Sequence, residues 1–230
     1  MVSIADNLQA VKGRIAAAAR SCGRDPESVT LLAVSKTWPF ESIAAAFRCG
    51  QRAFGENYVQ ELVAKGEALS ASPIEWHFIG PLQSNKTRPV AERADWVHSI
   101  DRLRVAERLS QQRPAQRPPL QVCVQVNVSG EASKGGVAPG EAAALSIAVN
   151  ALPRLRLRGL MCIPEASDDP AVQRQAFAQL RQIADELRAA GLALDTLSMG
   201  MSHDLEAAIA EGATIVRVGT AIFGERQRAG

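Results

Sequence analysis

The first residue whose type and position could do chemistry is Lys36. It directly follows a mostly apolar run at residues 30–35 (TLLAVS), so we expect its aliphatic stem to be partly buried. A lysine amine that is desolvated near other cations has a depressed pKa and attacks carbonyl carbons as a nucleophile. The alternative is a lysine that extends from a strand end into solvent. Taken alone, the strand context favours this second interpretation.

Arg217 is the second unusual residue, because it lies between Val216 and Val218 inside an apolar run. A guanidinium group stays protonated in proteins, so it needs a hydrogen-bond acceptor when it is buried. One possible acceptor is a carboxylate, and the other is a ring nitrogen of a bound cofactor. The local sequence leaves both open.

Two loops of small residues complete the set, at residues 198–204 (SMGMSHD) and 218–225 (VGTAIFGE). Their backbone N–H groups, with the hydroxyls of Ser202 and Thr220, would bind a phosphate. The alternative is a pair of ordinary turns, with Ser202 capping a helix that begins near Asp204. A reactive lysine, a cation for a ring nitrogen and a phosphate-binding loop pair are together the three contacts that pyridoxal 5′-phosphate requires.

The elements that must position these residues alternate between short apolar runs and longer helical patterns. The predicted strands are residues 30–35, 53–55, 75–79, 96–99, 120–128, 155–162, 196–198 and 214–218. The predicted helices between them are residues 41–49, 58–69, 86–93, 102–112, 140–150, 171–190 and 204–211, after an N-terminal helix within residues 1–20.

Eight βα units predict an α/β fold, a single parallel (β/α)8 barrel of the TIM type with an extra N-terminal helix, over one domain of residues 1–230. An open doubly wound sheet is the alternative, but the first strand ends in residues 35–39 (SKTWP), without the glycines of a dinucleotide-binding loop. In a barrel, functional side chains gather where the strands end. Lys36, Asn57, Ser202, Arg217, Gly219 and Thr220 all follow or close predicted strands.

The composition limits the class of protein. A net charge of +2 gives no large positive field for nucleic acid, and 47% hydrophobic residues suit a globular core. The sequence contains neither an apolar run of the ~18 residues that a membrane span needs nor a signal-peptide pattern. The four cysteines are scattered without a CxxC pair, which argues against zinc and disulfides. We therefore expect a cytoplasmic protein with reduced thiols, no metal site and no membrane partner.

Several long motifs resemble one known family. AVSKTWP, FGENYVQE, WHFIGPLQSNK, NVSGEASKGG and SMGMSHDLEAAIAEGATIVRVGTAIFGER, which together span about residues 31–226, are similar to the pyridoxal phosphate homeostasis proteins, whose fold resembles the N-terminal barrel of alanine racemase. The resemblance implies a Schiff base on Lys36, Ser202, Gly219 and Thr220 around the phosphate, Arg217 facing the pyridine nitrogen, and Asn57 near the ring. Cys162, in LMCIP, departs from the alanine or threonine expected there.

The resemblance also implies a function in intracellular vitamin B6 homeostasis and supply, with little or no turnover. Racemases use a second base, a tyrosine from a C-terminal domain, and we expect this chain, which ends at Gly230, to lack that domain and its dimer contacts. Tyr58 is its only tyrosine and is expected to pack at a helix start. We therefore expect a monomeric carrier that passes the cofactor to apo-enzymes. The alternative is a stand-alone cofactor-dependent amino acid racemase or lyase.

Three features remain open at this level. His77 is interpreted as an inner histidine with satisfied hydrogen bonds rather than as a base. Lys86 is either a second cofactor-handling lysine or, as we favour, a surface lysine at a helix start. The charged loop from Glu131 to Lys134 is either solvated or a flap near the site.

Overall fold

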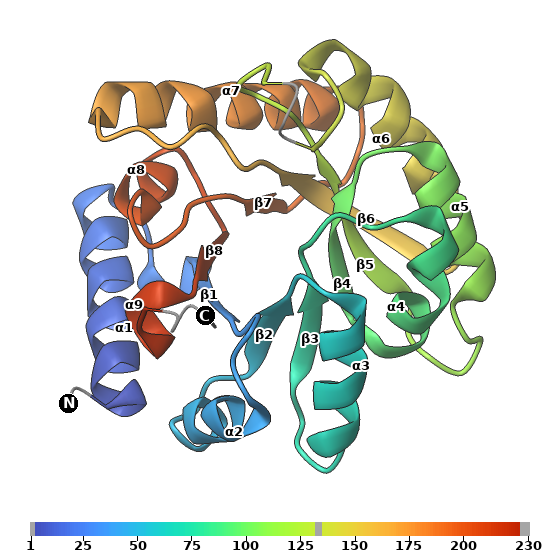
Figure 1. Cartoon of the computed structure of the whole chain (residues 1–230). Coiled ribbons are helices and arrows are strands. Elements are labelled where there is room, and N and C mark those ends of the chain that lie inside the picture. The colour runs from blue at the N-terminus through green and yellow to red at the C-terminus, as the bar shows by residue number, and fades with distance from the viewer. Residues whose placement is uncertain (1–2, 132–134, 226–230) are drawn as a thin grey trace.

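Eight parallel strands form a closed barrel in the computed structural model, which describes residues 3–131 and 135–225 (Figure 1). Each strand pairs with the next one along the chain, and β8 pairs with β1 through a register that sets Arg217 opposite Leu32. The strands are β1 (Thr30–Val34), β2 (Ala53–Glu56), β3 (Glu75–Phe78), β4 (Trp96–Ile100), β5 (Leu120–Gln125), β6 (Leu155–Met161), β7 (Thr196–Ser198) and β8 (Ile215–Val218). The predicted fold class is therefore confirmed.

Helices surround the barrel (Figure 1). They are α1 (Ile4–Ser21), α2 (Phe40–Arg48), α3 (Val59–Ala68), α4 (Thr87–Arg93), α5 (Leu103–Gln112), α6 (Ala142–Asn150), α7 (Pro170–Ala189), α8 (Leu205–Ala210) and α9 (Thr220–Phe223), with 3₁₀ turns η1 (Pro26–Ser28), η2 (Ser84–Lys86) and η3 (Pro139–Glu141). Predicted and observed boundaries differ mostly by one or two residues. The four-residue α9 is too short to leave a periodic pattern, so the sequence analysis read it as part of a loop.

The largest boundary difference is at β5, which was predicted to reach residue 128 but ends at Gln125. The apolar alternation continues through Val126, whose N–H still donates to the Met161 carbonyl of β6 at 2.8 Å. Val126 also forms an isolated bridge to Val137. Asn127 then accepts from the backbone N–H of Gly130 and so holds a turn. The turn that Asn127 stabilises therefore ends the strand, although the apolar alternation continues beyond Gln125.

Local signals explain where the two longest helices begin. Ser3 and Asp6 form a reciprocal capping box at the start of α1, and Asp169 accepts from the N–H of Ala171 ahead of Pro170 in α7. Helix α1 packs against α8 and α9, the helices that follow β7 and β8 (Figure 1). The N-terminal helix thus supports the elements that follow β7 and β8.

The core has two parts, because successive strand residues point to opposite faces of the sheet. A large outer cluster fills the space between the strands and the helices. A smaller apolar cluster fills the barrel interior and consists of Leu32, Ala53, Ile79, Trp96, Cys123, Met161 and Ile215. The interior also holds buried polar side chains, including those of His77, His98, Ser198 and Arg217. No helix in residues 3–131 and 135–225 is long and apolar enough to cross a membrane.

Candidate functional site

All six predicted site residues line one pocket at the carboxyl ends of the strands. The pocket has a volume of about 190 Å³. Its lining consists of Lys36, Asn57, Ser202, Arg217, Gly219 and Thr220, together with Val34, Ile79, Ile163, Met201 and His203. These residues come from segments up to 186 positions apart, and barrel closure between β1 and β8 joins them. Their contacts with a cofactor stay predictions.

The backbone next to Lys36 is held in a conformation that β-branched residues rarely adopt. Thr37 has a φ of 68°, in the left-handed region. Its backbone N–H donates to the Glu61 carboxylate at 2.7 Å, and the N–H of Trp38 donates to the Ser35 carbonyl at 3.1 Å. These two bonds turn the chain sharply after β1. The turn leaves the half-buried Lys36 side chain at the pocket.

A second lysine, Lys65, stabilises the turn after β1 through hydrogen bonds. The buried Lys65 of α3 donates to the Ser35 carbonyl at 2.8 Å, to Glu56 at 2.8 Å and to Glu61 at 2.5 Å. Ser35 also donates its hydroxyl to Glu56 at 2.6 Å. Lys65, Glu56 and Glu61 therefore tie β1, β2 and α3 together under the Lys36 loop.

Burial is the largest single influence on the pKa values of Glu56 and Glu61, yet these two pKa values move in opposite directions. It raises the pKa of Glu56 to about 7, although Lys65 and the Ser35 hydroxyl act in the opposite direction. Burial also opposes ionisation of Glu61, but hydrogen bonds from Lys65 and the Thr37 N–H lower the pKa of that carboxyl. The second oxygen of Glu56, Oε2, is buried without a hydrogen-bond partner among the described residues. An oxygen in that setting favours the protonated acid.

Arg217 is 4% exposed, and its bonds differ from the carboxylate pair considered from sequence. Its Nη1 atom donates to the carbonyl and hydroxyl oxygens of Ser198 at 2.6 and 2.9 Å, and Nη2 donates to the Cys162 carbonyl at 2.8 Å. Within the described part of the chain it makes no ion pair. Burial lowers its pKa, but the group remains cationic at neutral pH. The carboxylate alternative is therefore wrong.

The contact of Cys162 with Arg217 does not depend on the type of side chain at position 162. Its side chain is fully buried, and its carbonyl oxygen, not its thiol, contacts Arg217. Any residue type supplies the same carbonyl. The three bonds use three of the five N–H donors of Arg217. They leave Nε–H and one Nη2 hydrogen with no bond to the described residues, on a side chain that lines the pocket.

Asn57 reaches the pocket because two strands approach closely where they end. A Cβ atom on Gly80 would lie 2.1 Å from the Asn57 carbonyl oxygen, so only glycine fits there. Ser99 donates its hydroxyl to the Gly80 carbonyl at 2.5 Å and fixes the loop after β3. The Oδ1 atom of Asn57 is buried without a partner among the described residues. It is an acceptor available to a ligand in the pocket.

The predicted phosphate-binding residues follow β7 and β8 and line the same pocket. Gly219 packs closely on β1, since a Cβ there would lie 3.1 Å from the Val34 carbonyl oxygen. Gly200 adopts a φ of 92°, which allows the loop after β7 to fold back on α8. Arg14 of α1 holds this loop by donating to the Ser202 carbonyl at 3.0 Å. Both loops are thus fixed by packing that small residues permit.

Ser202 does not cap the following helix, contrary to the role considered from sequence. Helix α8 begins at Leu205 with Asp204 at its N-cap and without a side-chain cap bond. The Asp204 carboxylate instead accepts from the Met201 N–H at 2.5 Å. The Ser202 hydroxyl is therefore not used in capping.

Other sequence interpretations have mixed outcomes. Lys86 is exposed and lines a groove between α3 and α4, away from the pocket, which confirms the surface interpretation. His77 is buried with both ring nitrogens hydrogen-bonded, also as interpreted. Tyr58 is the N-cap of α3, so it lies at a helix start as expected, and it is 53% exposed. In the loop from Glu131 to Lys134, residues 132–134 lie outside the described residues.

Sequence reasoning missed several pocket residues. Ile79, Ile163 and Met201 supply apolar walls, and exposed His203 adds an imidazole. Ile79 and Ile163 end or follow interior strand positions, so a strict count of alternation along β3 and β6 would have found them. His203 lies inside the SMGMSHD motif but carried no separate signal.

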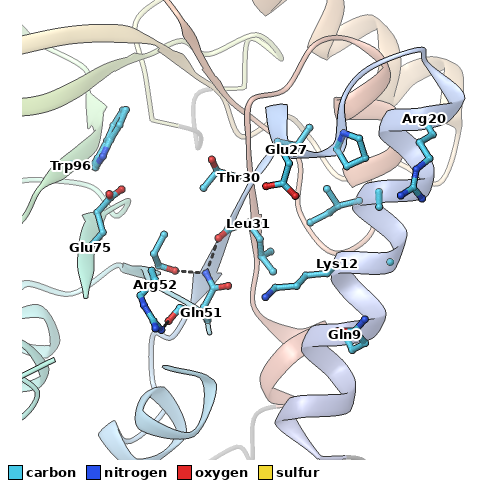
Figure 2. A pocket seen from close by; sticks show the side chains of 16 residues that line it. Gln9, Lys12, Arg20, Glu27, Thr30, Leu31, Gln51, Arg52, Glu75 and Trp96 are labelled. Atoms are coloured by element: carbon cyan, nitrogen blue, oxygen red, sulfur yellow. Dashed lines mark hydrogen bonds between the residues drawn. The ribbon is translucent and has the colours of Figure 1, made fainter. Parts of the chain in front are cut away.

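A larger cavity lies at the opposite face of the barrel. It has a volume of about 930 Å³ and lies between α1 and the amino ends of β1 to β4. Figure 2 shows its charged lining, with Lys12 of α1 on one side and Glu75 and Trp96 on the other. Gln51 closes part of it by donating to the carbonyls of Leu31 and Ala53. None of the six predicted site residues contacts this cavity.

Comparison with known proteins gives concordant matches. The family model described as alanine racemase, N-terminal domain, matches residues 7–227. A Pseudomonas aeruginosa protein named pyridoxal phosphate homeostasis protein is 60% identical over 98% of this chain and 97% of its own length. The structure of PipY from Synechococcus elongatus with PLP bound is 39% identical with a TM-score of 0.84, and the match covers 96% of this chain and 100% of PipY.

A more distant match shows the fold alone. Alanine racemase from Corynebacterium glutamicum has a TM-score of 0.70 at 18% identity, over 97% of this chain and 63% of the racemase. The resemblance inferred from the motifs is confirmed by the 60% identical relative and by the family match along almost the whole sequence. The chain belongs to the pyridoxal phosphate homeostasis protein family, built on the barrel of the alanine racemase N-terminal domain.

Proposed function

We propose that this protein binds pyridoxal 5′-phosphate in the pocket at the carboxyl ends of the strands and serves in intracellular vitamin B6 homeostasis. The Lys36 amine would condense with the cofactor aldehyde to form a Schiff base, with loss of one water molecule. Names and bound ligands of relatives support the cofactor: the Pseudomonas relative is a pyridoxal phosphate homeostasis protein, and PipY binds PLP. When bound, the cofactor would supply an electrophilic carbon and an electron-withdrawing ring.

The observation that carries this proposal is the bonding of Arg217. Its two uncommitted N–H donors belong to a permanent cation that lines the pocket. Such donors need an acceptor, which an unprotonated pyridine nitrogen provides. The unpartnered Oδ1 of Asn57 and the hydroxyls of Ser202 and Thr220 suit the remaining polar groups of the same ligand.

The same geometry supports a carrier with little or no turnover. A cation at the ring nitrogen disfavours its protonation, and an unprotonated ring withdraws electrons from a substrate carbanion less strongly. We propose that the protein is a cytoplasmic monomer that transfers the cofactor to apo-forms of cofactor-dependent enzymes. We also propose that residues 1–230 form a single domain.

The second candidate function is that of an amino acid racemase or lyase that acts alone, and one observation favours it. A racemase needs two bases on opposite faces of its substrate. Among the described residues that line the pocket, Lys36 and His203 carry an amine and an imidazole, the side-chain groups that can serve as such bases. His203 is thus the residue on which this alternative depends.

The test of cofactor binding is borohydride reduction followed by peptide mapping. We expect purified protein to be yellow and the reduced cofactor to be fixed on one peptide that contains Lys36. Lys36→Ala should remove the colour while circular dichroism stays unchanged. A label on the peptide that contains Lys65 or Lys86 would contradict the assignment.

Turnover is tested on the same holo-protein by incubation with D- and L-alanine and chiral chromatography. The carrier proposal expects no interconversion above the rate of free cofactor. Interconversion that disappears in both Lys36→Ala and His203→Ala would establish the enzyme instead.

A further inference from the structure

A continuous chain of hydrogen bonds crosses the barrel interior from Arg217 to the opposite face. Arg217 Nη1 lies 2.9 Å from Ser198 Oγ, which lies 2.7 Å from His98 Nδ1. His98 Nε2 lies 2.8 Å from His77 Nδ1, and His77 Nε2 lies 2.6 Å from Glu75 Oε1. The three middle side chains are at most 1% exposed.

The two ends of the chain are a permanent donor and a carboxylate, and bonds that all run in one direction satisfy both of them. Arginine only donates, so the Ser198 oxygen accepts from Arg217, and its own proton can be donated to His98 Nδ1. An ionised carboxylate only accepts, so His77 Nε2 carries the proton that it donates to Glu75. In this direction the middle bond runs from His98 Nε2–H to His77 Nδ1. Each histidine then carries one ring proton, on Nε2.

The charges around the chain agree with this assignment. Complete burial, with a smaller contribution from the nearby Arg217 cation, lowers the pKa of His98 well below its usual range, so its ring is neutral. The hydrogen bond from His77 lowers the pKa of Glu75, with further lowering from Trp96 and Arg158. Glu75 is therefore a carboxylate at neutral pH. The indole ring of Trp96, which lines the cavity of Figure 2, stacks on the His77 ring with the ring centroids 5.4 Å apart.

We propose that Glu75, His77, His98 and Ser198 are positioning residues that fix Arg217 as a hydrogen-bond donor toward the cofactor ring. The inference rests on the proposed function of the pocket. Arg217 makes no direct ion pair among the described residues, and the chain connects it to a carboxylate through three neutral side chains. Bonds that all run in one direction polarise one another, so the Ser198 oxygen becomes a stronger acceptor for Arg217.

The chain also gives Glu75 an influence on the cofactor site from the opposite face of the barrel. Glu75 is half exposed and lines the large cavity, where Figure 2 shows it next to Trp96. Removal of its charge would weaken the polarisation at the Glu75 end and, through it, the hold on Arg217. Residues that act on a site through such a network typically change affinity by about 2- to 30-fold.

The first test needs no cofactor. The sequence has three histidines, so a ¹⁵N spectrum that correlates ring nitrogens with ring protons contains three ring systems, and His203→Gln assigns the third. We expect His77 and His98 of the apo-protein at neutral pH to be Nε2–H tautomers. A protonated His77, or a His98 that carries its proton on Nδ1, would reverse the chain and overturn the inference.

The second test measures cofactor affinity and the absorption maximum of bound cofactor. We expect Glu75→Gln and Ser198→Ala to weaken binding about 2- to 30-fold and to shift the absorption maximum. Glu27→Gln is the matched control, because Glu27 lines the same cavity outside the chain, and it should bind as wild type. Glu75→Gln alters a half-exposed side chain and should fold even if Ser198→Ala does not.

The two proposals fail in different ways. Wild-type protein that does not bind the cofactor would overturn the proposed function, while the tautomers of the apo-protein still decide the direction of the chain. Normal wild-type binding with an unchanged affinity and spectrum in Glu75→Gln would overturn the positioning role alone.

Discussion

The ammonium group of Lys65 lies 2.8 Å from the backbone carbonyl of Ser35, the residue immediately before Lys36. One buried lysine thus positions another that could do chemistry. Lys65 is held in turn by two carboxylates, so the turn after β1 rests on an ionic cluster rather than on apolar packing alone. We therefore expect the position of Lys36 to be sensitive to changes in α3.

Lys65→Met is expected to lower the free energy of unfolding by about 3–5 kcal/mol, because it leaves a buried carboxylate without its partner. The bond to the Ser35 carbonyl is lost at the same time, so cofactor affinity should fall as well. Urea denaturation and cofactor titration measure the two effects. Lys12→Met, on the exposed surface of α1, is the control and should change stability by less than about 0.5 kcal/mol. Equal stability of both variants would show that the cluster contributes nothing net.

The stability of the protein should depend on pH through Glu56. Its folded-state pKa of about 7 lies above the ordinary value of 4.5, so the folded protein binds the proton more tightly than the unfolded chain does. The resulting stabilisation is fully present below pH 4.5 and is lost as the pH rises through about 7. Relative to Glu56→Gln, wild type should lose roughly 1–3 kcal/mol of unfolding free energy across this window. Urea midpoints at several pH values measure this loss.

Glu41→Gln, an exposed substitution on α2, controls for general effects of charge. It should follow the wild-type pH profile. If Glu56→Gln also follows that profile, Glu56 ionises normally in the folded protein.

The phosphate contacts are tested by removing single hydroxyls. Ser202→Ala and Thr220→Ala should each weaken pyridoxal 5′-phosphate binding about ten- to a hundred-fold, because a charge-assisted hydrogen bond contributes roughly 1.5–3 kcal/mol. Pyridoxal without phosphate provides the internal comparison. It should bind weakly to wild type and be little affected by either substitution. Equal binding of the two ligands to wild type would mean that these loops do not bind phosphate.

Substitution of two glycines by alanine should change the stability of the protein in opposite directions. Gly80→Ala places a Cβ atom within 2.1 Å of the Asn57 carbonyl oxygen, so the ends of β2 and β3 must separate. We expect a loss of more than about 2 kcal/mol and weaker cofactor binding. Gly13→Ala meets nothing within 4 Å on exposed α1 and should stabilise the protein by about 0.5–1 kcal/mol. Thermal denaturation of both variants checks the contrast.

The sequence by itself determined the barrel and the residues that meet in its pocket. Alternating runs predict parallel βα units, and in a closed parallel barrel every strand ends at the same face. Residues that follow different strands, such as Lys36 and Arg217, therefore had to converge. The lining of one pocket by all six predicted residues follows from that geometry.

Only the tertiary structure decided what holds these residues in place. Arg217 bonds the carbonyls of Ser198 and Cys162, and Lys65 bonds that of Ser35. A backbone carbonyl is the same for every residue type, so no sequence pattern reveals such a partner. Ser198 and His98 meet across 100 positions of the chain because alternate strand residues point inward and the closed sheet sets their register. The identity of the site thus follows from local patterns, whereas its support arises from long-range contacts that local patterns do not encode.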